Sequence, residues 1–72
     1  MTFTIIGYNT KKGNILKNRI IKIVNEMDSK VTINLEMSNA KNAPILYLNK
    51  KRISTNKVPT ERELQKQIKN NL

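Results

Sequence analysis

The sequence predicts one small α/β domain, a mixed four-stranded sheet with two helices in the order β-α-β-β-β-α. Three observations predict this fold. An apolar segment at residues 2–8 leads through a turn into a segment whose apolar residues recur at helical spacing. Residues 31–36 alternate between apolar and polar side chains, as half-buried strands do. The last third of the chain holds a proline-led hairpin and a helix-capping pattern. At 72 residues, the chain 1–72 is expected to form a single domain with a small core.

The first strand and the first helix form one unit. Residues 2–8 carry apolar side chains on both sides of the strand, so we expect a central strand with cover on more than one side. The helix is expected to begin at residue 14 or 15 and to end at residue 27. Its apolar residues recur at i, i+4, i+7, i+8 and i+11. This core-facing stripe consists of Leu16, Ile20, Ile23, Val24 and Met27.

The second strand is expected at residues 31–36, after a helix break at residues 28–30. Because a helix separates the first two strands, they are expected to be parallel and joined by a right-handed crossover. Residues 37–43 are short and polar and show no periodicity, which predicts a loop.

The third and fourth strands are expected at residues 44–48 and 52–55, joined by a turn into a hairpin. Pro44 takes the first strand position, where a missing N–H does least harm. Basic residues at the hairpin tip are typical of an exposed edge that avoids pairing with another sheet.

The closing helix has the clearest local signal in the chain. Thr60 and Glu63 form a T-x-x-E capping box, and acidic residues in the first turn favour the positive end of the helix. Leu64 and Ile68 are expected to point inward.

The composition excludes several chemistries. Cysteine and histidine are both absent, which removes disulfides, thiol catalysis, Cys/His zinc sites and histidine acid–base chemistry. The five acidic residues form no evident catalytic pair or metal cluster. We therefore expect no enzyme activity, no cofactor, no metal and no small-molecule substrate. No apolar run has the length of a signal peptide or a membrane span, so a soluble, cytoplasmic protein without a membrane role is expected.

The charge of the chain indicates acidic partners. With 14 basic and 5 acidic residues, the net charge is +9, which favours nucleic acid, an acidic protein or an anionic surface. Almost all of the basic residues are lysines, whereas base-reading and bidentate phosphate sites prefer arginine. A solvated lysine-rich surface is therefore the competing interpretation of this charge.

Two basic segments are candidate binding sites. At the start of the first helix, backbone N–H groups, the helix dipole and two ammonium groups would suit an anion. This segment consists of Thr10, Lys11, Lys12 and Gly13. At the hairpin tip, Lys50, Lys51 and Arg52, with Lys57 nearby, could straddle a phosphate backbone. A solvated loop and a solubilising turn are the alternatives for these two segments.

The element order resembles that of a small thioredoxin-like or glutaredoxin-like domain, over most of the 72 residues. The resemblance lies in I-I-G-Y-N-T-K-K-G-N, N-A-P-I-L-Y-L and V-P-T-E-R-E-L-Q-K-Q-I. The first segment is similar to the helix start where that family keeps Cys-x-x-Cys. The second is similar to the segment with a cis-proline before the third strand. The third is similar to the start of the closing helix.

The departures from that family concern its chemistry. Thr10-Lys11-Lys12-Gly13 stands where the family has Cys-x-x-Cys, so the domain is expected to be redox-inactive. Only Pro44 matches a functional position. The resemblance implies a cis Ala43–Pro44 bond and a backbone free to pair with an extended partner, although Ala-Pro bonds are trans far more often in general. The segment before Pro44 is too short for the family's second helix.

These observations favour a non-enzymatic binding or structural module that docks through basic loops into a larger assembly, such as a nucleoprotein or virion-type particle. The alternative is a direct nucleic-acid-binding protein that uses its lysine-rich loops. A third hypothesis is a small inhibitor of a partner enzyme.

Overall fold

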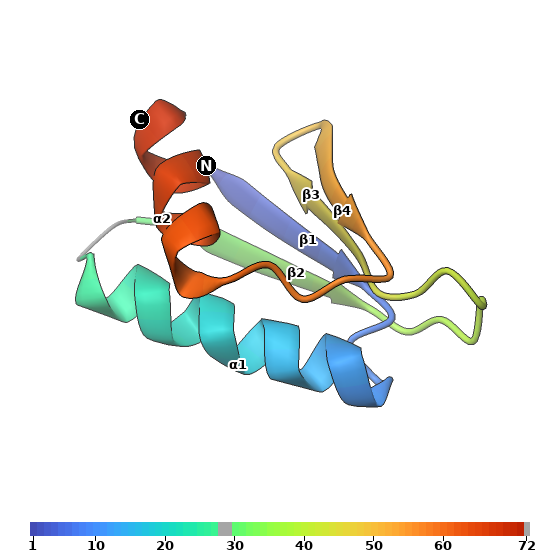
Figure 1. Cartoon of the computed structure of the whole chain (residues 1–72). Helices are drawn as coiled ribbons and strands as arrows, with labels where there is room; N and C mark the ends of the chain where they lie inside the picture. The colour runs from blue at the N-terminus through green and yellow to red at the C-terminus, as the bar shows by residue number, and fades with distance from the viewer. Residues whose placement is uncertain (28–29, 72) are drawn as a thin grey trace.

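The computed structural model describes residues 1–27 and 30–71, and it has the predicted order of elements (Figure 1). The strands and helices are β1 (Thr2–Ile6), α1 (Lys11–Glu26), β2 (Thr32–Glu36), β3 (Ile45–Leu48), β4 (Lys51–Thr55) and α2 (Glu61–Asn70). The predicted helix break at residues 28–30 falls partly outside the described residues. Within the described ranges, no helix combines the length and apolar character needed to cross a membrane.

The sheet has the strand order β2-β1-β3-β4, so β1 is a central strand, as predicted. β1 is parallel to β2, as the helical connection between them predicts, and antiparallel to β3. The register aligns Phe3 with Ile33 on one side and with Leu48 on the other. Because neighbours in register share a face, apolar side chains of β1 and β3 gather on one side of the sheet.

Both helices pack against this one face of the sheet (Figure 1). The core combines the predicted stripe of α1 with the strands and with the inward residues of α2. Its buried members are Phe3, Ile5, Leu16, Ile20, Ile23, Val24, Leu46, Leu48, Leu64 and Ile68. The last residue of the predicted stripe, Met27, is partly buried against this cluster.

The expectation of cover on both sides of β1 was wrong. Thr4 and Tyr47 pair across the sheet and lie on the face away from the helices, where both are half-buried. The physical reason is the connection between β2 and β3, which contains no helix that could cross to this face.

The same connection confirms the prediction of a loop at residues 37–43, and the Ala43–Pro44 peptide bond that follows is cis.

The start of α1 differs from its prediction. Thr10 is the N-cap, and its hydroxyl accepts a hydrogen bond from the Gly13 N–H at 3.0 Å. The same hydroxyl donates to the Gly7 carbonyl at 2.8 Å. α1 therefore begins at Lys11 rather than at residue 14 or 15. Apolar periodicity could not locate this turn, because its inward-facing residue is a glycine.

Two glycines allow β1, α1 and the loop before β3 to meet. A Cβ at Gly13 would lie 2.0 Å from the Gly7 carbonyl oxygen. Gly7 has a φ of +89°, and a Cβ there would lie 2.6 Å from the Ala43 Cβ. Side chains at these positions would separate the three segments, because the backbone at Gly7 and the Cβ of Ala43 have little room to move.

We predict that Gly13→Ala lowers the free energy of unfolding by about 3 kcal/mol or more, because the new methyl group meets backbone atoms. Urea denaturation followed by circular dichroism measures this change. Asn14→Ala is the matched control, because Asn14 is exposed in the same turn. It should change stability by less than about 0.5 kcal/mol. Equal stability of Gly13→Ala and the native chain would contradict the close approach.

Candidate functional site

The start of α1 brings two predicted segments together. Thr10 and Gly13 contact Gly7, and Gly7 packs against Ala43 in the loop that leads to Pro44. Lys11 and Lys12 are exposed, and neither forms an ion pair within the described part of the chain. However, the Gly13 N–H is already bonded to the Thr10 hydroxyl, and the Asn14 N–H to the Thr10 carbonyl. The cap therefore uses donors that an anion would need.

The hairpin tip lies at the other end of the sheet from the start of α1. The Asn49 N–H donates to the Thr2 carbonyl at 2.6 Å, which fixes the tip beside the first residue of β1. The start of α1 instead follows Ile6, the last residue of β1. The basic segments Lys11–Lys12 and Lys50–Arg52 are therefore separated by the length of the central strand (Figure 1).

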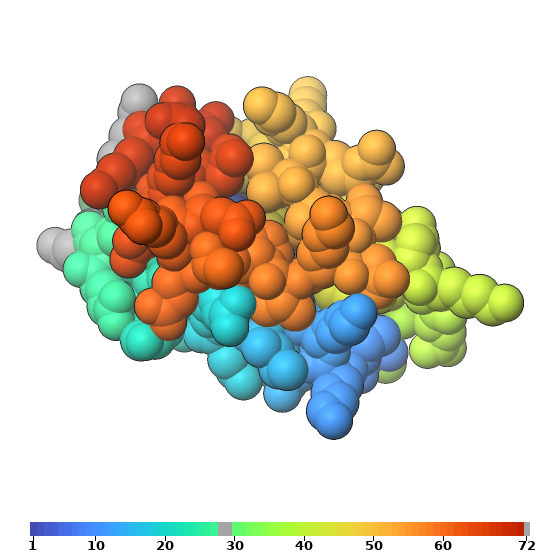
Figure 2. All heavy atoms as spheres, viewed as in Figure 1, coloured from blue at the N-terminus to red at the C-terminus, as the bar shows by residue number. Residues whose placement is uncertain are grey.

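A groove separates β4 from α2 and has a volume of about 560 Å³. One wall consists of residues 52–55 of β4, and the other consists of Glu63, Leu64 and Gln67 of α2. Lys57, Val58 and Pro59 line the connection between these walls. Figure 2 shows the face of the molecule on which α2 and the β4 segment lie. Of the residues named for the hairpin-tip site, Arg52 and Lys57 line this groove, and they lie toward opposite ends of β4.

The groove contains an unsatisfied polar group. The Ser54 hydroxyl is buried and has no hydrogen-bond partner among the described residues. A buried hydroxyl without a partner costs about 1–3 kcal/mol, so such groups are rare in native structures. Sequence reasoning missed Ser54, because neither its burial nor its lack of a partner leaves a signal in a short polar strand.

Two exposed basic residues, Arg52 and Lys57, line the groove, and Arg52 pairs with Tyr47, so its side chain leaves β4 on the face away from the helices. Within the residues that the structure describes, neither Arg52 nor Lys57 forms an ion pair. The acidic residue of the lining is Glu63, which accepts a hydrogen bond from the Thr60 hydroxyl at 3.1 Å. The Glu63 N–H in turn donates to that hydroxyl at 3.2 Å, so the predicted cap of α2 by Thr60 is confirmed.

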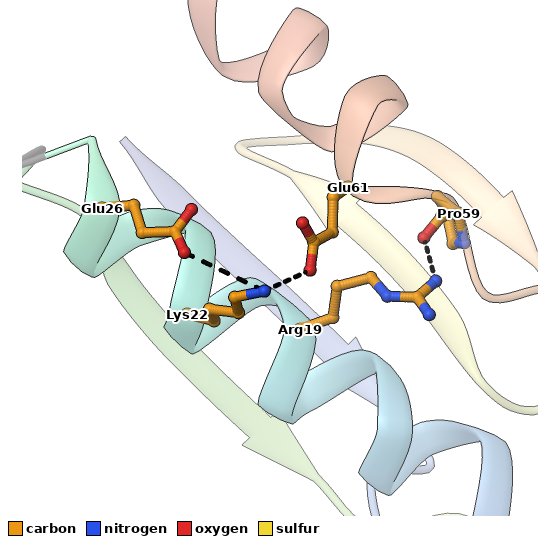
Figure 3. A network of polar contacts seen from close by, with 5 residues as sticks. All are labelled: Arg19, Lys22, Glu26, Pro59 and Glu61. Carbon is orange, nitrogen blue, oxygen red and sulfur yellow. Dashed lines mark hydrogen bonds and ion pairs between the residues drawn. The ribbon is translucent and has the colours of Figure 1, made fainter.

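Polar contacts with α1 hold the second wall of the groove in place (Figure 3). Arg19 donates to the Pro59 carbonyl at 2.8 Å, just before α2 begins. Lys22 pairs with Glu61 at 2.9 Å and also lies 3.9 Å from Glu26. The hydrogen bond and the charge of Lys22 lower the pKa of Glu61, and those of Glu61 raise the pKa of Lys22.

The polar side chains that line the groove define its chemistry. They carry two hydroxyls, an amide, two cations and the capping carboxylate of Glu63. Across residues 1–27 and 30–71, no cluster of three or more His, Cys, Asp or Glu side chains could hold a metal ion. The arrangement suits a ligand with negative charge and a hydrogen-bond acceptor.

We predict that Ser54→Ala raises the free energy of unfolding by about 1 kcal/mol, because it removes a buried hydroxyl without a partner. Ser38→Ala is the matched control, since the Ser38 hydroxyl accepts a hydrogen bond from the Ala40 N–H at 3.1 Å. That variant should be neutral or slightly destabilised in the same urea denaturation. A marked loss of stability in Ser54→Ala would mean that its hydroxyl has a partner.

We predict that the stabilising effect of Glu61 depends on pH. Because its pKa is lowered in the folded state, the carboxylate contributes fully above its ordinary pKa of 4.5 and loses this contribution as the pH falls through the folded value. The raised pKa of Lys22 leaves its contribution intact below 10.5. The difference in stability between the native chain and Glu61→Gln should therefore be constant near neutral pH and vanish in acid. A difference that persists in acid would contradict the ion pair.

Comparison with known proteins found no matching family model, no matching curated protein and no matching solved structure.

Proposed function

We propose that this chain is a non-enzymatic binding module that docks onto a protein partner within a larger assembly. The observation that carries the proposal is the groove between β4 and α2. Among residues 1–27 and 30–71, Arg52 and Lys57 there lack ion pairs and the Ser54 hydroxyl lacks a hydrogen bond. Groups that a fold leaves unsatisfied gain most from a ligand, because binding removes a cost already present in the free protein.

We further infer that the domain is a reduced, cysteine-less variant of the thioredoxin-like fold. The support is a central β1 between a parallel β2 and an antiparallel β3, together with Thr10–Gly13 packed beside the Ala43–Pro44 loop. Because the sequence contains no cysteine, thiol exchange is excluded for the residues given, and binding is the activity left to such a domain.

Direct binding of nucleic acid is the alternative function. The exposed lysines at the start of α1 and at the hairpin tip favour it, because each could contact phosphate. However, the two basic segments lie at opposite ends of β1, which argues against one continuous binding surface for a nucleic-acid strand. The polar groups that line the groove lie closer to one another than the basic residues of the two segments do.

Two measurements test the proposed function. Fluorescence anisotropy with labelled duplex and single-stranded DNA and RNA should show binding at about 50 mM salt that is lost at about 150 mM. Micromolar binding that persists at the higher salt, with a slope that implies several phosphate contacts, would replace the proposal with the alternative.

The second measurement uses the tagged chain in nuclease-treated extract of its native source. On size exclusion it should elute in an assembly that Arg52→Glu with Lys57→Glu disrupts. Lys11→Glu with Lys12→Glu is the matched control, because it makes the same charge change outside the groove, and it should leave the assembly intact. A solitary monomer, or equal sensitivity to both pairs of substitutions, would overturn docking through the groove.

A further inference from the structure

β4 is an edge strand with a free side. In the part of the chain that the structure describes, β4 pairs with β3 alone, and the sheet ends at β4. In an antiparallel pair, every second residue of an edge strand directs its N–H and carbonyl outward, where another strand can pair with them. β4 begins with two cationic residues, Lys51 and Arg52. The β4 strand of a second copy of the chain would therefore be repelled, whereas an acidic strand would be attracted.

The groove follows β4 rather than crossing it. Residues 52–55 line it in succession, so a ligand in the groove lies alongside the strand. On the opposite wall, Glu63, Leu64 and Gln67 have the spacing i, i+1 and i+4 and share one side of α2. The volume of about 560 Å³ is within the range of sites that enclose a ligand. An extended segment fits this shape better than a compact molecule does.

The lining would select among extended segments. Ile53 and Val58, which are partly buried, supply apolar surface for a side chain of the ligand. Ile53 is the extra residue of a β-bulge, because Ser54 pairs with Leu46 while Arg52 pairs with the next residue, Tyr47.

The polar groups of the lining indicate an acidic ligand. Arg52 and Lys57 have no ion pair within the described ranges, and the Glu63 carboxylate is occupied by the cap of α2. Among the described residues, the buried Ser54 hydroxyl has no hydrogen-bond partner, so it is a donor that an acceptor of the ligand could satisfy. Each of these groups would be satisfied by carboxylate or carbonyl oxygens.

We propose that the groove binds an extended, acidic segment of the partner protein, which pairs with the free edge of β4 as a fifth strand. Backbone hydrogen bonds to β4 supply affinity. Side chains of the segment that face α2 meet the groove and Lys57, and those on the other face lie beside Arg52. This proposal rests on the proposed function, because it specifies the chemistry of the protein that docks there.

A synthetic probe tests the mode of binding with the full chain. The probe is a labelled peptide that alternates valine and glutamate, measured by fluorescence anisotropy at about 150 mM salt. Its matched control has the same sequence and charge but carries N-methyl groups on alternate amides, which remove backbone donors. Strand addition predicts that N-methylation weakens binding roughly tenfold or more, which corresponds to about 1.4 kcal/mol.

Variants of the chain locate the site. Arg52→Glu with Lys57→Glu should weaken binding of the peptide roughly tenfold or more, whereas Lys11→Glu with Lys12→Glu should change it less than about threefold. Ser54→Ala, which is expected to fold at least as well as the native chain, should weaken binding severalfold. Binding of the peptide should also slow amide hydrogen exchange on the outward side of β4.

Each contrary result identifies what fails. Equal binding of the N-methylated peptide would show attraction by charge alone and overturn strand addition. Equal losses in both pairs of charge substitutions would overturn the groove as the site. If the peptide does not bind while the assembly in extract still depends on Arg52 and Lys57, strand addition fails and docking through the groove stands. If neither occurs, the proposed function fails as well.

Discussion

The close approach of three backbone segments at Gly7 is the constraint on which the rest of the structure depends. There the first turn of α1 rests on the end of β1, and the loop before β3 closes from the other side. This contact sets the height and direction of α1 over the sheet, and therefore which residues of its stripe reach Phe3 and Ile5. A chain this small has few other large contacts, so an error at this junction would displace the whole core.

The groove follows from how the second helix is attached. Leu64 and Ile68 join the core, while Arg19 and Lys22 tie the start of α2 to α1. Exposed ion pairs contribute little stability, so burial of the apolar side chains is the main attachment and the polar contacts set the orientation. Because α2 packs against α1, it does not cover β4. One wall of the groove thus rests on the helix layer and the other on the sheet.

Local signals predicted the elements, and only tertiary contacts could have predicted the site. The stripe of α1 and the cap at Thr60 are each encoded in a short stretch of sequence, and the structure has both. The expected alternation at residues 31–36 holds in part, because Val31 and Ile33 pack against the core whereas Leu35 is exposed. The first turn of α1 was missed because its inward residue is Gly13, which has no apolar side chain to count. The distance between the two basic segments follows from strand register, and the isolation of the Ser54 hydroxyl follows from what packs around it. Neither this distance nor the isolation of the hydroxyl can be predicted from a single segment of the sequence.

The bare edge of β2 gives the net charge of +9 a further physical role. β2 has no lysine, arginine or proline, its residues are largely exposed, and its outer side is unpaired. Such an edge can pair with the β2 of another copy, and within β2 only its short length and the charge of Glu36 discourage the encounter. Repulsion between two strongly positive molecules acts before the edges meet, over a Debye length of about 8 Å at physiological ionic strength. The lysine-rich surface is therefore also a colloidal barrier, whose height is set by the salt around the protein.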